Sequence, residues 1–375
     1  MRVWRYWALE SAAGTALLAA GLGLVFLYGL YWAGGTTRHT ILFSKDTIVF
    51  FFIDVVLVVG LQIFSGNSGI LSFGHTAFMG AAAYAASLLT IDPALKPYVS
   101  PGLPHYLETR SVGFVPAVLL ALAVVALLAL ATGLVVLRLD GASAVMAILS
   151  LLLIAFVVFG AWTSVTRGAG GLYGMPESTT IGWAFGGAVL AVLVARLFKD
   201  SKTGLQLQGS REDAFSAASI GVHVRAARLR AWVLSAIVSG AGGALFALKL
   251  GAITPSTFYL QETFTIVVML VIGGMTTVGG AVVGVAVVTF VREVLKPYES
   301  KSLDLGLVHF DRLTNLTNLA LVALILGVMY FRREGLVGRR ELDESLRRLV
   351  RPGPGECRRS SASRRSAFRR VTRRR

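Results

Sequence analysis

Few residues of this sequence could carry out chemistry inside its long apolar stretches. Asp54 is the only acidic residue near the middle of such a stretch. Arg292 and Glu293 lie near the end of another stretch, and Arg138 and Asp140 border a third. Ionisable residues are costly inside a membrane and usually have a function there. Two interpretations of Asp54 therefore stay open: a polar pathway or packing contact, or a paired or hydrated acid near a helix end.

The motifs of catalytic and metal sites are missing from the sequence. It contains no HExxH motif, no paired cysteine or histidine ligands and no GxxxxGK[ST] phosphate-binding loop. His75 has no histidine or carboxylate neighbour at the helical spacing that a metal site would need. We therefore predict no catalytic residue, no metal site, no cofactor and no ATP hydrolysis by this chain alone. For His75 we expect a hydrogen bond at the start of a helix.

Three glycine-rich breaks interrupt the apolar stretches, at Gly66–His75, Arg167–Pro176 and Ile272–Gly280. Glycine lets the backbone turn and lets neighbouring segments approach closely. The backbone of an unwound helix could offer polar groups to a solute, so we predict a substrate path near the breaks. The residues assigned to this path are Gly66, Gly69, Ser72, His75, Gly170, Gly171, Gly174 and Asp54, with Ser72 also a candidate helix cap. The alternative is close helix packing through small residues.

The polar segment Gln208–Gly221 is the sharpest feature of the sequence. Ser210 is a candidate N-cap, two acidic residues follow it in the first turn, and a glycine can end the helix. We predict a short helix with a smooth alanine face, which either docks a cytoplasmic partner or lies on the membrane surface. The residues assigned to docking are Arg211, Glu212, Asp213, Ala217, Ala218 and Gly221.

The elements that must position these residues are apolar helices. The chain of 375 residues is 55% hydrophobic and 15% charged, whereas soluble domains have about 45–50% and about 25%. This composition, with apolar runs of membrane-spanning length, predicts an all-α polytopic integral membrane protein with about ten transmembrane helices and Gly-rich breaks. The predicted runs are Ala12–Trp32, Thr47–Phe64, Phe73–Ile91, Val112–Leu137, Ala142–Ala161, Ile181–Phe198, Leu229–Lys249, Phe264–Thr277, Val278–Leu295 and Leu316–Phe331.

Charge predicts how these helices cross the cytoplasmic membrane. The formal net charge is +16, and basic residues flank the apolar runs, so topology explains the charge and no nucleic-acid partner is expected. The loop Lys199–Arg228 is basic whereas Gly251–Thr263 has no Lys or Arg, which places the first loop and both termini in the cytoplasm. We predict a transmembrane permease domain over 1–331 and a basic, disordered tail over 332–375 that could touch membrane lipids.

Four segments, in order, resemble the permease subunits of branched-chain amino acid ABC importers of the LivM kind. They are Gly66–Leu89, Gly168–Pro176, Arg211–Phe258 and Val271–Val285. The resemblance implies import of branched-chain or other hydrophobic amino acids. It also implies three kinds of partner: a second permease subunit, two cytoplasmic ATPase subunits that bind ATP and Mg²⁺, and an extracytoplasmic substrate-binding protein. Membrane lipids are a further expected partner of a chain embedded in the bilayer. In this family a helix like Arg211–Gly221 fits a groove on the ATPase, although Ser216 departs from the usual acid-Ala-Ala start.

Other functions are less well supported by the sequence. Related permeases carry other small solutes, such as urea or amides, so the solute stays open. A self-sufficient channel or secondary transporter would be expected to carry more intramembrane acids than Asp54. An integral membrane enzyme would need a catalytic constellation, and none is found in the sequence.

Overall fold

A computed structural model describes residues 18–28, 44–100, 102–103, 108–299, 303–304, 309–310, 316–332 and 334–338. Most of the predicted tail 332–375 and both ends of the run Ala12–Trp32 lie outside these residues. The longer helices are Leu18–Tyr28, α2 (Lys45–Ser68), α3 (His75–Thr90), α6 (Phe114–Val136), α7 (Gly141–Ala161), α9 (Ile181–Asp200), α10 (Lys202–Glu212), α12 (Val224–Leu250), α13 (Leu260–Gly273), α14 (Val278–Glu299) and α15 (Leu316–Phe331).

Short elements join these helices. They are α4 (Lys96–Val99), α8 (Thr163–Thr166), α11 (Ala214–Ser219), η1 (Gly168–Gly170), η2 (Pro255–Phe258), β1 (Leu172–Tyr173), β2 (Ala252–Ile253), β3 (Leu303–Asp304) and β4 (His309–Phe310). β1 pairs antiparallel with β2, with Leu172 opposite Ile253, and β3 pairs antiparallel with β4.

Each of the ten predicted apolar runs coincides with a helix in the part of the chain that the structure describes. Seven helices are long and apolar enough to cross a membrane, and Leu18–Tyr28 and Leu316–Phe331 are shorter apolar helices. The prediction of an all-α polytopic membrane protein is confirmed.

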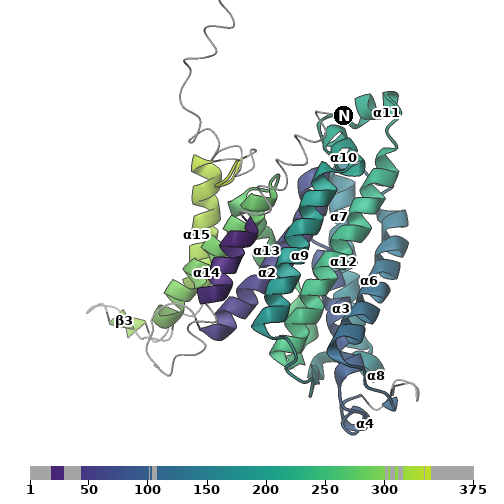
Figure 1. The fold of residues 1–375 in the computed structure, drawn as a ribbon, viewed down its shortest axis with the longest axis vertical. Coiled ribbons are helices and arrows are strands. Elements are labelled where there is room, and N and C mark those ends of the chain that lie inside the picture. Colours follow the sequence, from purple (N-terminus) through teal and green to yellow (C-terminus); the bar gives the residue numbers. More distant parts are fainter. Residues whose placement is uncertain are drawn as a thin grey trace, which may run out of the picture.

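The central helix of the bundle is α2, which carries apolar residues on every side and a few buried polar ones, Asp54 among them. Its residues from Phe51 to Ser68 are all buried, because α9, α12 and α14 pack around it. A helix that is hydrophobic all round belongs in the interior of a large bundle or in a membrane. α3 lies between α12 and α6 on the other side of the bundle. In Figure 1, α2 passes behind α9, between the α12 group of helices and α14.

The outer helices contact the bundle through one narrow line of residues. On α6 the buried positions recur nearly every four residues, and almost all carry small side chains: Ala117, Ala121, Val125, Ala129, Gly133 and Val136. The other faces of α6 expose large residues such as Leu119 and Leu127. Small residues let helices approach closely in a membrane, while exposed leucines suit lipid tails. This pattern therefore separates the protein-facing side of α6 from its lipid-facing side.

Glycines allow two of the helix pairs to touch backbone to backbone. A Cβ on Gly243 of α12 would lie 2.1 Å from the carbonyl oxygen of Met79 in α3. A Cβ on Gly284 of α14 would lie 1.9 Å from the carbonyl oxygen of Met269 in α13. Within the third glycine-rich break, Ile272–Gly280, a Cβ on Gly273 of α13 would clash with the carbonyl oxygen of Gly280 in α14, so this break forms the close α13–α14 packing that was the alternative interpretation of the breaks.

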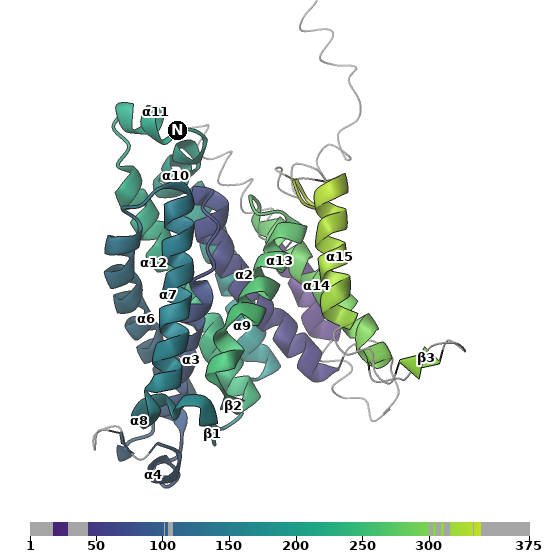
Figure 2. The same ribbon diagram turned by 180° about the vertical axis from the view of Figure 1, so that it is seen from behind.

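The two ends of the bundle carry different features, as Figures 1 and 2 show. One end, here called the α10 end, carries α10, α11 and the last residues of α15. The other, here called the α4 end, carries α4, α8 and the β1–β2 pair. The basic loop Lys199–Arg228 lies at the α10 end, and the loop Gly251–Thr263, which lacks Lys and Arg, lies at the α4 end.

Candidate functional site

The predicted helix Arg211–Gly221 is in fact two helices, and this corrects the prediction. α10 ends at Glu212 and α11 begins at Ala214, with Asp213 extended between them. The Asp213 carboxylate accepts hydrogen bonds from the backbone N–H of Phe215 (2.9 Å) and Ser216 (3.1 Å), so it caps α11. Ser210 is not the N-cap, because it lies inside α10 and its hydroxyl donates to the carbonyl of Leu207.

The same hydrogen bonds lower the pKa of the Asp213 carboxyl group. Hydrogen bonds from the side chain and backbone of Ser216, with that from the backbone of Phe215, hold the pKa of Asp213 below its usual value. The carboxylate is therefore ionised at neutral pH, which is the form that caps a helix best. Gly221 follows α11 with a φ of +86°, so the prediction that Gly221 ends this helix is confirmed.

The exposed surface of α11 and its C-cap carries two large apolar side chains, so it is not the smooth alanine face that was predicted. Phe215 and Ile220 are 83% and 82% exposed, whereas Ala217 is buried and only Ala218 of the predicted alanine pair is exposed. Ala217 thus faces inward and is unavailable to a partner in this conformation. Two large exposed apolar side chains on a short helix are the features that a complementary pocket would recognise.

α10 is fastened to the end of α2. Arg211 donates from Nη1 to the carbonyl of Gly66 at 3.0 Å, and Gln208 donates from Nε2 to Oδ1 of Asn67 at 3.1 Å. Gly69 ends α2 with a φ of +74°, and a Cβ there would lie 2.5 Å from Cγ of Arg211. Gly66 itself lies inside α2, so the first break begins at Gly69 rather than at Gly66.

His75 is the first residue of α3 and is held by hydrogen bonds at both ring nitrogens. Its Nδ1 lies 2.5 Å from the Ser72 hydroxyl, and its Nε2 lies 2.5 Å from the Ser235 hydroxyl. Ser235 donates its one proton to the carbonyl of Gly60 (2.6 Å), so it accepts from Nε2–H of His75, and Nδ1 pairs with the Ser72 hydroxyl. The predicted hydrogen bond at a helix start is confirmed. Ser72 bonds the ring rather than capping α3, whose N-cap is Gly74.

The second glycine-rich break lies at the opposite end of the bundle. Gly171 and Gly174 have positive φ, and a Cβ on Gly171 would lie 2.8 Å from the carbonyl oxygen of Ile253. Gly170 is less constrained, because a Cβ there would meet only Arg167 at 3.9 Å. The structure thus places Gly66, Gly69, Ser72 and His75 at the α10 end and Gly170, Gly171 and Gly174 at the α4 end.

Asp54 belongs to neither break and lines a polar cleft of about 490 Å³. Twelve residues of helix separate it from Gly66, about 18 Å along α2. The cleft is bounded by the first turns of α2, α13 and α15 and the last turns of α14. Its lining residues are Thr47, Phe50, Phe51, Asp54, Gln261, Thr289, Arg292, Glu293, Lys296, Glu299, Thr317 and Asn318. The cleft therefore extends from the α4 end to a buried acid.

Two charged residues act on Asp54 across the helix interface, and sequence reasoning did not connect them with it. Glu262 of α13 and Arg292 of α14 are close enough to act electrostatically on its carboxylate. Arg292 also donates to the Thr265 hydroxyl at 3.0 Å. The available signal was weak, because Glu262 precedes an apolar run and Arg292 lies near the end of another. Together the three residues form a charged cluster within the helical bundle.

A bundle of apolar helices around a charged cleft, with the α10–α11 pair at its far end, is the architecture of a multi-pass membrane protein. The chain belongs to the family described as "Branched-chain amino acid transport system / permease component", which matches residues 44–331. This agrees with the resemblance seen in its sequence motifs.

Two curated proteins are similar to the chain, and both are named "High-affinity branched-chain amino acid transport system permease protein LivM". The protein of Escherichia coli (strain K12) is 23% identical over 306 residues, which cover 72% of this chain and 67% of the relative. That of Salmonella typhimurium is 24% identical over 294 residues, which cover 69% and 65%. The matched region thus spans about two thirds of each relative. No solved structure matches the chain.

Proposed function

We propose that the chain is the permease subunit of an ATP-driven importer of branched-chain or other hydrophobic amino acids. Membership of the permease family carries this proposal, because the related proteins are named for such transport. The exposed helix pair α10–α11 supports it, since a subunit without its own ATPase needs a surface through which an ATPase can act. The α10 end then faces the cytoplasm, in agreement with the basic loop Lys199–Arg228.

The helix α2 connects the two working ends in this proposal. Arg211 and Gln208 of α10 bond its last turns, and Asp54 on the same helix lines the cleft at the other end. A nucleotide-dependent movement of the docked ATPase would shift α10 and, through these bonds, the end of α2. The cleft would then alternate between open and closed states whose populations the nucleotide sets.

The partners follow from this mechanism. Two cytoplasmic ATPase subunits would bind ATP and Mg²⁺, and the Phe215–Ile220 face of α11 would fill a groove on one of them. A second permease subunit would complete the membrane part. An extracytoplasmic substrate-binding protein would deliver the solute at the α4 end, where the cleft opens.

Affinity purification tests the proposal. The tagged chain, produced with its genomic neighbours, should copurify an ATPase and support ATP-dependent leucine uptake in proteoliposomes. Phe215→Ala should weaken ATPase binding by about thirtyfold and lower both copurification and uptake, because a central buried aromatic anchor contributes about 2 kcal/mol or more to an interface. Tyr98→Ala is the matched control for ATPase copurification, since Tyr98 is 78% exposed at the opposite end. Uptake that proceeds without any ATPase would contradict the proposal.

One observation favours a second candidate, an ion-coupled transporter. The structure adds Glu262 to Asp54 as an acid of the charged cluster, which answers part of the objection that intramembrane acids are too few. Such a transporter would take up solute in response to an ion gradient alone. Uptake driven by a proton or sodium gradient in liposomes that hold only this chain would support the ion-coupled transporter over the ABC importer. Uptake of urea or an amide, but not of leucine, would show that the solute is one of those compounds.

A further inference from the structure

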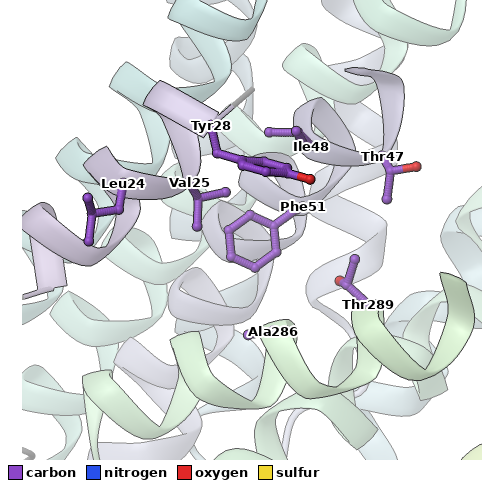
Figure 3. Close-up of a pocket in the computed structure, with 8 residues that line it drawn as sticks. All are labelled: Leu24, Val25, Tyr28, Thr47, Ile48, Phe51, Ala286 and Thr289. Carbon is purple, nitrogen blue, oxygen red and sulfur yellow. The ribbon is translucent and has the colours of Figure 1, made fainter. Parts of the chain in front are cut away.

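An apolar cavity of about 400 Å³ lies directly beside the polar cleft. Thr47, Phe51 and Thr289 line both spaces, so the two share a wall. The remaining lining of the apolar cavity comes from helix Leu18–Tyr28, from α2 and from α14: Leu24, Val25, Tyr28, Ile48 and Ala286. Figure 3 shows the rings of Tyr28 and Phe51 turned toward one another, with Ala286 and Thr289 on the neighbouring α14.

The polar cleft holds two polar side chains that make no hydrogen bond with any residue that the structure describes. Asp54 is 9% exposed and lines the cleft, yet it makes no hydrogen bond or ion pair with any residue that the structure describes. Thr289 in the shared wall is also 9% exposed, and its hydroxyl has no hydrogen-bond partner within the same residues. Buried polar groups are normally paired, so these two indicate that something else satisfies them.

The charges of the cleft have both signs. Asp54, Glu293 and Glu299 supply carboxylates, and Arg292 and Lys296 supply cations. Glu293 accepts from the Thr47 hydroxyl and Glu299 accepts from the backbone N–H of Thr317. Among the described residues, the guanidinium of Arg292 makes one hydrogen bond, from Nη2 to the Thr265 hydroxyl, and it acts electrostatically on Asp54. Hydrogen-bonding capacity therefore remains on the Asp54 carboxyl group for an ammonium group, and on the other N–H groups of Arg292 for a carboxylate.

We propose that the paired cavities form one binding site for a free α-amino acid with a branched or long apolar side chain. The substrate ammonium would lie against Asp54, its carboxylate against Arg292, and its side chain would pass the shared wall into the space between Phe51, Tyr28 and Ala286. This inference rests on the proposed function and adds the location and chemistry of the site. The combined size suits a small ligand, because such pockets occupy roughly 300–1,000 Å³.

A membrane phospholipid would satisfy the same cavities less well. Its phosphate would lie at the mouth of the cleft, where the two carboxylates of Glu293 and Glu299 repel it and the one ammonium group of Lys296 attracts it. An amino acid instead offers a cation to the deepest acid, Asp54, which lies nine residues, or about 14 Å, along α2 from Lys45. The charge pattern therefore favours the amino acid.

Cysteine protection tests the site without any ATPase, so its result is independent of whether transport is ATP-driven. The full chain in nanodiscs would carry Thr47→Cys in a background of Cys357→Ser, and maleimide labelling would be timed. L-leucine should slow labelling, whereas 4-methylpentanoate, which lacks the ammonium, and isopentylamine, which lacks the carboxylate, should require about tenfold or higher concentrations. Equal protection by all three, or none by leucine, overturns the proposal.

Two variants separate the halves of the site. Arg292→Gln should weaken protection by leucine about tenfold or more and leave that by isopentylamine unchanged. Ala286→Phe should fill the apolar cavity and abolish protection by leucine but not by L-alanine. The matched control is Ala131→Phe, because Ala131 is exposed on α6 and lines neither cavity. If Ala286→Phe instead displaces copurified phospholipid and leucine still protects, the cavity is a lipid site and the proposal is wrong.

Discussion

At the residue scale, His75 was placed on the substrate path by its position in a glycine-rich break. The structure gives the ring two hydrogen-bond partners, because the hydroxyls of Ser72 and Ser235 lie 2.5 Å from its two nitrogens. The ring packs edge-on against Trp232, with centroids 5.1 Å apart. His75 therefore joins α3 to α12 and, through Ser235 and the carbonyl of Gly60, to α2.

A single hydroxyl tests this network. Ser235→Ala should lower the free energy of unfolding by about 1–3 kcal/mol, because Nε2–H of His75 loses its acceptor while buried. Ser150→Ala is the matched control, since the Ser150 hydroxyl is exposed and bonds only its own helix at Met146. Denaturation of the purified protein in mild detergent would measure both. Equal stability of the two variants would contradict the interhelical role.

At the scale of the element, the α10–α11 segment is a jointed pair rather than one helix. Asp213 creates the joint, because its carboxylate bonds the N–H groups of the residues after it and its own backbone is extended. The joint leaves α10 bound to α2 while α11 presents Phe215 and Ile220 outward. A partner that moves α11 can then act on α2 through α10.

A substitution of Asp213 can remove the N-cap of α11 and leave the rest of the α10–α11 segment in place. Asp213→Ala should speed hydrogen exchange of the α11 amides and weaken ATPase copurification, whereas Asp213→Asn should preserve both, because asparagine also caps helices well. In the folded protein the pKa of Asp213 lies below its usual value. The carboxylate is therefore ionised, and the cap fully formed, at every pH above the usual pKa of an aspartate, and the stability it contributes is lost only as the pH falls through the lowered pKa. Exchange rates corrected for their intrinsic pH dependence should be constant from about pH 5 to pH 8. A titration of α11 within that interval would contradict the capping role.

At the scale of the whole molecule, the two candidate functional surfaces lie at opposite ends of the bundle. The α10 end carries the exposed helix pair, and the α4 end carries the opening of the polar cleft. Helix α2 runs between them, buried over most of its length by α9, α12 and α14. In the proposed function, this arrangement would place partner binding and solute entry on opposite sides of the membrane.

Labelling from one side of the membrane tests this orientation. In a Cys357→Ser background, Tyr98→Cys at the α4 end should react with an impermeant maleimide in right-side-out vesicles. Ala218→Cys on exposed α11 should react only after the membrane is permeabilised. The opposite pattern would invert the proposed topology and move the docking helices outside the cell.

The sequence by itself determined the helices and the family. Long apolar runs must span a bilayer because unpaired backbone groups are costly in lipid, so all ten runs could be found without knowing their neighbours. The basic loops that flank the apolar runs, and the glycine-rich breaks between the runs, could also be identified from the sequence alone. The joint at Asp213 was missed because an acid suits both the first turn of a helix and its N-cap, and the sequence does not distinguish the two.

Only the tertiary structure decided which polar groups meet. Asp54 and Arg292 are separated by more than 200 residues, and no spacing rule relates them. They come together because α13 and α14 pack against α2, and the glycines of α14 and α13 set how closely those helices lie. The same packing places the apolar cavity beside the charged cleft. Electrostatic and hydrophobic contacts depend on distance in space, and for residues this far apart in the chain only the packing of the helices sets that distance.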